Sequence, residues 1–374
     1  MLDRTHTDVG KDQWKLTDDV VRLRQWATHI CHDLPDAPDH LLTIGSEPGC
    51  WLYLQGERVS RRHAYLRKEE GKWLLRDAPS KNGVSVDGVS REEDIKLEPG
   101  LELLIGGTTL VAESNRSIAL RVFLARILGW GSEQTRPVDL ALRAIRNAAI
   151  GQSPLVLCGE GDLLFVARTI HKYALGTERP FVVCDTRKQQ QSDEEEEEDE
   201  RAAERYRLGL QALPAAKHGS LCVRIGHLPP DFVAVRTSLQ DRDARVQLIM
   251  CASKTTDAMK FGVNPVIIPP LAQRRREIDR IVSEYVADAA AELRLPRSSF
   301  PDADEKWIVA NAATSLSEIE KATLRVLAIR EAERVPGRGA LNRAATRLGM
   351  RRFSLARWVV KHKFQIAAQD EIKL

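Results

Sequence analysis

The chain of 374 residues has few cysteines, no long apolar run and no export signal. Its six cysteines are scattered and form no CxxC pair, which predicts reduced core thiols rather than zinc ligands or disulfides. No apolar run approaches the roughly 18 residues that a membrane span needs, so we expect no membrane partner. The first residues lack the basic and then apolar pattern of a secretory signal, and we therefore expect a cytoplasmic protein.

An excess of either sign of charge is also lacking overall, since 56 Lys or Arg against 53 Asp or Glu leave a net charge of only +3, but the charges are unevenly distributed. Residues 193–200 are eight consecutive acids, whereas residues 336–374 carry nine Lys or Arg and two acids. The acidic run predicts a solvated loop because like charges repel. One interpretation is a passive linker that replaces a deleted functional loop. The other is a mimic of a polyanion that folds back on the basic C-terminal tail and inhibits it. The tail itself indicates a polyanionic partner, and double-stranded DNA is the polyanion we expect.

The N-terminal third contains short apolar runs separated by Pro-Gly, Asn-Gly and Gly-Gly turns, a pattern typical of an all-β sandwich. Four blocks in this region are "TIGS", "VSRRHA", "DAPSKNGVSVDG" and "LEPGLELLIGGTTL". In this order and spacing they resemble a forkhead-associated (FHA) domain, a family of phosphothreonine-binding modules. The resemblance covers roughly residues 20–113.

The FHA resemblance implies a phosphopeptide site on two loops. Its implied ligand-binding residues are Ser60, Arg61, Ser80, Lys81 and Asn82. His63 is implied to support the first loop from inside the sandwich. Ser46 stands where the family has an arginine, so a contact worth about 2–3 kcal/mol is missing unless Arg61 or Lys81 replaces it. The alternative is a sandwich that binds proteins without any dependence on phosphate.

From about residue 135 strand-like and helical segments alternate, which indicates a parallel sheet in an α/β domain. The characteristic blocks are "SPLVLCGEG", "GSLCVRIGHLP", "RVQLIMCAS", "VIIPPLAQRRREIDRIVSEYVADAAAELRL" and "SLSEIEKATLRVL". They resemble the AAA+ domain and helical lid of bacterial enhancer-binding proteins, the ATP-driven activators of sigma-54. This resemblance spans roughly residues 135–332.

The groups that such ATPases use for phosphoryl transfer are absent from these blocks. The phosphate loop is about two residues short, lacks its lysine and hydroxyl residue, and consists of Gly159, Glu160 and Gly161. Other replacements are Arg224 for the Walker B acids, Ser253 for the sensor asparagine and Ser317 for the lid arginine. The arginine finger and the sigma-contacting loop are missing as well. We therefore expect a scaffold that is not an enzyme and holds no nucleotide, cofactor or metal. An active ATPase with remote substitutes is the alternative.

The C-terminal block "GALNRAATRLGMRRFSLARWVVKHKF" predicts two helices with a turn at Gly349. It resembles the Fis-type helix-turn-helix that ends sigma-54 activators, which implies a DNA-reading second helix and a homodimer. We expect that helix to direct Phe353, Leu355 or Ala356, Trp358 and Val359 inward. The residues expected to face DNA are Arg351, Arg352, Ser354, Arg357 and Lys361. The alternative is a basic hairpin that packs on the AAA+ body.

The sequence thus predicts a multidomain fold: an all-β FHA sandwich, an α/β AAA+-like domain with a helical lid, and a small all-α helix-turn-helix. The predicted units are 1–115 (sandwich, with its core at about 40–112), 120–275 (degenerate AAA+), 276–333 (lid) and 334–374 (helix-turn-helix). The predicted function is that of a non-enzymatic transcriptional regulator. The alternative is a signalling adaptor that binds proteins and not DNA.

Overall fold

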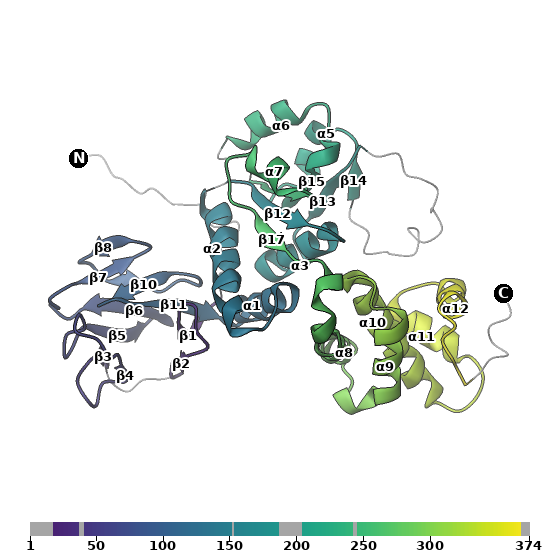
Figure 1. Cartoon of the computed structure of the whole chain (residues 1–374), viewed down its shortest axis with the longest axis horizontal. Helices are drawn as coiled ribbons and strands as arrows, with labels where there is room; N and C mark the ends of the chain where they lie inside the picture. The colour runs from purple at the N-terminus through teal and green to yellow at the C-terminus, as the bar shows by residue number, and fades with distance from the viewer. Residues whose placement is uncertain (1–17, 37–40, 152, 187–203, 242–244, 368–374) are drawn as a thin grey trace.

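The structure is a computed structural model that describes residues 18–36, 41–151, 153–186, 204–241 and 245–367. Three parts follow one another along the chain: a β-sandwich, a mixed α/β part and a group of helices (Figure 1). The sandwich and the terminal helices lie on opposite sides of the molecule, and α1 and α2 connect the sandwich to the α/β part (Figure 1). The acidic run at 193–200 lies outside the described residues.

The β-sandwich consists of two sheets, with strand orders β2-β1-β11-β10-β7-β8 and β4-β3-β5-β6-β9. The strands are β1 Val20–Gln25, β2 Cys31–Asp33, β3 Leu42–Gly45, β4 Leu52–Tyr53, β5 Ala64–Glu69, β6 Lys72–Asp77, β7 Val84–Val86, β8 Val89–Arg91, β9 Ile95–Lys96, β10 Glu102–Ile105 and β11 Thr108–Ser114. Apolar residues alternate along them, so that Leu66 and Leu75, paired across β5 and β6, are both fully buried. The predicted all-β sandwich is confirmed.

The α/β part is built on a parallel sheet of order β14-β13-β15-β16-β12-β17. Its strands are β12 Leu155–Gly159, β13 Phe181–Cys184, β14 Glu204–Tyr206, β15 Ser220–Arg224, β16 Gln247–Ala252 and β17 Val266–Ile268. Every residue of β16 is buried, because helices cover both faces of the sheet. The helices of this part are α1 Asn115–Leu128, α2 Thr135–Gly151, α3 Leu163–Leu175, α5 Gly209–Ala215, α6 Phe232–Leu239 and α7 Thr255–Met259.

The two faces of the sheet belong to two separate hydrophobic clusters. Leu157 and Ile249 pack with α1, α2 and α3 on one face, whereas Val156 and Met250 pack with α5 and α6 on the other. Successive side chains of a strand point to opposite faces, so each buried strand contributes to both clusters. The predicted mixed α/β region is therefore confirmed.

Five α-helices form most of the last part of the described chain. They are α8 Ile278–Glu292, α9 Asp302–Asn311, α10 Leu316–Glu333, α11 Ala340–Leu348 and α12 Arg352–Lys361. One continuous hydrophobic cluster runs from Ile281 on α8 to Leu355 on α12 and beyond. The predicted boundary between residues 333 and 334 therefore lies within a shared core. Among the described residues, no helix combines the length and the apolar character needed to cross a membrane.

Candidate functional site

The predicted phosphopeptide loops lie side by side at one end of the sandwich, and His63 joins them from inside. Its side chain is fully buried. Its Nδ1 accepts a hydrogen bond from the Ser60 backbone N–H (3.0 Å), and its Nε2 donates to the carbonyl oxygen of Gly83 (3.0 Å). The carbonyl acceptor requires a proton on Nε2, and the Ser60 N–H requires a lone pair on Nδ1. His63 thereby holds the loop before β5 against the loop before β7.

Two further hydrogen bonds tie the same loops together. The Ser60 hydroxyl accepts from the backbone N–H of Lys81 (3.1 Å), and the Asn82 amide donates to the carbonyl oxygen of Arg58 (2.9 Å). Ser80 instead closes its own turn, because its hydroxyl donates to Asp77 (2.6 Å) and accepts from the N–H of Gly83 (2.9 Å). The structure therefore brings all five predicted ligand-binding residues to one rim of loops, with the Ser80 hydroxyl occupied in the turn.

Ser46 also lies at this rim, at the end of β3, but its side chain turns inward. Its hydroxyl donates to the carbonyl oxygen of Val59 (3.0 Å). The preceding residue is Gly45, where the backbone of β3 lies close to that of Arg61. A larger residue does not fit at this position, because an added Cβ would collide with the carbonyl oxygen of Arg61. The positive charge at the rim comes from the exposed side chains of Arg61 and Lys81, for which the described residues provide no ion-pair partner. An anion such as a phosphate monoester is the ligand that this charge favours.

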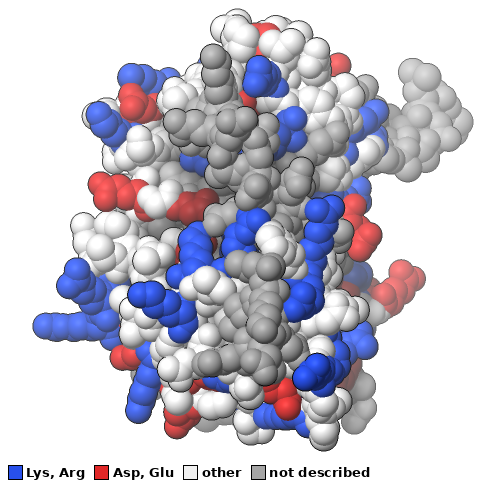
Figure 2. Space-filling model, turned by 90° about the vertical axis from the view of Figure 1, so that its right-hand side faces the viewer, with Lys and Arg blue, Asp and Glu red and all other residues white. Residues whose placement is uncertain are grey.

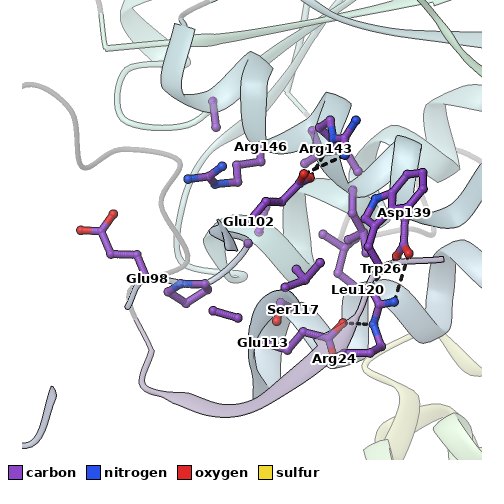
Figure 3. Close-up of a pocket in the computed structure, with 18 residues that line it drawn as sticks. Arg24, Trp26, Glu98, Glu102, Glu113, Ser117, Leu120, Asp139, Arg143 and Arg146 are labelled. Carbon is purple, nitrogen blue, oxygen red and sulfur yellow. Dashed lines mark hydrogen bonds and ion pairs between the residues drawn. The ribbon is translucent and has the colours of Figure 1, made fainter. Parts of the chain in front are cut away.

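A buried charge cluster joins the sandwich to α2, and sequence analysis did not predict it (Figure 3). The Arg24 guanidinium on β1 has no exposed surface and donates to Glu113 on β11 (2.7 Å) and to Asp139 on α2 (3.0 Å). Burial opposes the charge, but the hydrogen bonds and charges of Asp139 and Glu113 outweigh it and raise the pKa of Arg24. The available signal was two arginines, Arg22 and Arg24, on either side of the buried Leu23 in a short strand.

Two outer ion pairs extend this joint, of which Figure 3 shows the one between Arg143 and Glu102. Arg143 on α2 forms two hydrogen bonds of 2.7 Å with Glu102, and Arg146 forms two of 2.9 Å with Asp87. Asp87 follows the end of β7, whereas the phosphopeptide loop precedes its start, so the joint and the loops lie at opposite ends of the sandwich. The docked sandwich therefore leaves its loop rim open to a partner.

The segment predicted to be a degenerate phosphate loop leads into a carboxylate at the N-terminus of α3. Asp162 is the N-cap of α3, and its side chain accepts from the backbone N–H of Phe165 (3.1 Å). Helix N-termini bind phosphates through such N–H groups and through the helix dipole, so Asp162 both occupies a donor and repels an anion. Gly159 approaches β17 so closely that a Cβ would collide with the carbonyl oxygen of Ile268.

Arg224, which is predicted to replace the Walker B acids, forms an ion pair of 3.2 Å with Asp185. Arg224 ends β15 and Ser253 follows β16, so both lie at the carboxyl edge of the parallel sheet together with the loop after β12. In an ATPase this edge holds the nucleotide and magnesium. The structure brings Arg224, Ser253 and the loop after β12 to this edge, where they offer a cation, a hydroxyl and a helix N-terminus capped by Asp162.

The C-terminal helix α12 presents basic residues to solvent. Arg351, the N-cap, and Arg352 and Lys361 are exposed, and Arg357 is half-buried. Figure 2 shows Lys and Arg side chains across the lower half of the side on which α12 lies. Residues 336–367 contain eight Lys or Arg and no Asp or Glu. The charge of this face complements a polyanion.

The predicted orientation of two side chains of α12 is wrong. Ser354, expected to face DNA, is 3% exposed, and Phe353, expected in the core, is 50% exposed. Ser354 lies four residues before Trp358, so both share the inward side of the helix. The Trp358 ring packs 6.0 Å from that of Trp307 on α9, and this contact sets the rotation of α12.

The comparisons with known proteins concern the sandwich. A model of the FHA domain family matches residues 42–106, so the chain contains an FHA domain. An FHA domain from Chlamydia trachomatis is 26% identical, covers 25% of this chain and 95% of that chain, and has a TM-score of 0.23. Mycobacterium tuberculosis EmbR, solved with a low-affinity phosphopeptide, is 23% identical, covers 27% of each chain and has a TM-score of 0.24. No curated protein sequence matches the chain.

Proposed function

We propose that the protein is a non-enzymatic cytoplasmic regulator of transcription. Its FHA domain docks a threonine-phosphorylated protein at the Arg61 and Lys81 rim, and α12 places the assembly on double-stranded DNA. The observation that carries the proposal is that two exposed basic sites stand on opposite sides of a body whose phosphate loop ends in the carboxylate of Asp162. The α/β part is a scaffold of AAA+ descent between them.

The geometry of the carboxyl edge of the sheet supports a scaffold without ATP turnover. Phosphoryl transfer needs positioned cations and metal ions around the phosphates. Asp162 offers negative charge at the helix N-terminus, and Arg224 is neutralised by Asp185. A chain without this machinery does not remodel a sigma-54 polymerase, so we propose that it represses transcription or competes with active relatives for their sites.

The DNA-binding step is proposed for a helix-turn-helix formed by α11 and α12. Gly349 between them has φ +68°, the left-handed conformation that a tight turn requires. Two of the basic residues of this region have structural roles: Arg343 donates to the carbonyl oxygens of Ala332 and Val335, and Arg347 to that of Leu293. The arginines of α12 are thus the candidates for base and phosphate contacts. A homodimer would present two such helices to two half-sites.

The experiment is a comparison of duplex binding by the full chain and a charge-reversed variant, Arg352→Glu with Arg357→Glu. Wild-type affinity should fall steeply with salt, because each neutralised phosphate contributes about −0.9 to the slope of log K against log salt. The variant should lose most of this affinity. The matched control reverses two exposed charges of the sandwich, Arg91→Glu with Lys96→Glu, and should bind DNA as the wild type does. No duplex affinity in the wild type would support the adaptor function instead.

A further inference from the structure

An apolar stripe runs along the outward side of α12. Phe353 and Val360 are 50% and 47% exposed, and Arg357 lies between them in the helical sequence. Positions i, i+4 and i+7 share one side of a helix, so these three side chains form a continuous ridge. The ridge faces away from the core that holds Leu355 and Trp358.

The ridge combines an aromatic side chain with a cation. The Arg357 guanidinium carbon lies 4.9 Å from the centre of the Phe353 ring, within cation–π distance. Phe353 is the second residue of α12, and the first turn of the second helix is the part of a helix-turn-helix that meets base edges. Residues 336–367, which include α11 and α12, contain eight Lys or Arg and no acid, so the charge of this segment favours a polyanion over a basic partner.

We infer that Phe353 recognises thymine by direct contact, an inference that rests on the proposed DNA binding. In the major groove thymine presents a C5-methyl group, an apolar contact that a phenyl ring accepts, whereas cytosine has only a hydrogen at C5 and the purines present the N7 acceptor. Arg357, positioned beside the ring, is then directed at the neighbouring base pair, where guanine offers two acceptors. The specificity assigned to α12 is therefore a thymine adjacent to a guanine in each half-site.

The test starts from duplexes selected from a random library by the full wild-type chain. Each thymine of the selected site is replaced in turn by deoxyuridine, which removes only the methyl group. We expect one position per half-site to lose about fourfold in affinity, the value of burying one methyl-sized group. The variant Phe353→Ala should bind the thymine duplex more weakly and no longer distinguish it from the deoxyuridine duplex.

The control variant is Val233→Ala, which truncates an apolar side chain that is 80% exposed on α6 and should leave both affinities unchanged. A thermal melt verifies that Phe353→Ala folds, as expected for a half-exposed position. Selected duplexes that bind equally with deoxyuridine throughout would overturn the assignment of Phe353 while leaving DNA binding intact. Failure to select any duplex would overturn both.

Discussion

The Arg24 guanidinium on the first strand of the sandwich donates to the carboxylate of Asp139 on α2 over 3.0 Å, across 115 positions of sequence. Both side chains are buried, and Glu113 completes the cluster on the sandwich side. A buried charge without a partner is costly, so each carboxylate is needed to keep the guanidinium in place. The FHA domain is therefore fixed to the α/β part by a specific contact and not by a flexible linker.

Asp139→Ala tests this joint. Removing one partner of a buried ion pair leaves an uncompensated guanidinium, and we expect a loss of about 3–5 kcal/mol in the free energy of unfolding, measured in urea. The matched control is Asp19→Ala, which breaks the exposed ion pair with Lys72 and should cost at most about 1 kcal/mol. Equal losses for the two variants would contradict a special role of the buried cluster.

Ser46→Arg should strengthen phosphopeptide binding. The natural Ser46 hydroxyl is bonded to the Val59 carbonyl oxygen and adds no charge to the rim. A guanidinium at the end of β3 would supply a charge-assisted contact, and we expect about tenfold tighter binding of a phosphothreonine peptide selected from a random library. Affinity is measured by calorimetry, and the unphosphorylated peptide should gain nothing.

The control for this variant is Ser46→Gln, which extends the side chain without adding charge. It should leave the phosphopeptide affinity close to that of the wild type. If the glutamine variant gained as much as the arginine variant, the gain would come from side-chain length rather than charge, and the proposed phosphate position would be wrong.

Millimolar Mg-ATP should not change the melting temperature of the wild-type chain. A ligand present at 100 times its dissociation constant stabilises a protein by about 2.7 kcal/mol, which is several degrees in a melt. Asp162 at the N-terminus of α3 and Arg224 at the sheet edge argue against any such binding. A rise of several degrees, or phosphate release above that of a buffer control, would show that nucleotide still binds the chain.

The features that could be predicted from the sequence are those set by nearby residues. Turn chemistry and alternation locate the strands of the sandwich, and the loop around Asn82 follows from them. The capping role of Asp162 is local too, since aspartate is a favoured N-cap. The rotation of α12 could not be predicted in this way, because the contact between Trp358 and Trp307 sets it from another helix.

The charge cluster of the joint was missed for a related reason. An arginine in a strand such as β1 ordinarily indicates a solvent-facing position. Arg24 is buried because α2 covers it and provides Asp139 as its partner. The residues around Arg24 in the sequence do not indicate either contact. Contacts between segments that are distant in the sequence therefore determine both the rotation of α12 and the burial of Arg24.

His171→Gln should change how stability depends on pH. His171 on α3 is 3% exposed; its Nε2 donates to the Arg179 carbonyl oxygen (3.0 Å), and its Nδ1 accepts from the Ser220 hydroxyl (2.7 Å). Burial lowers the pKa of His171 below its ordinary 6.5, so the unfolded chain takes up a proton first as the pH falls. The contribution of neutral His171 to the free energy of unfolding is complete above pH 6.5. It is lost from there down to its folded pKa, by at most about 1.4 kcal/mol per pH unit.

Urea unfolding between pH 7.5 and pH 5 should show a shallower decline in the free energy of unfolding for His171→Gln than for the wild type. The control, His227→Gln at an exposed position, should follow the wild type. Identical slopes in all three proteins would contradict the buried neutral state.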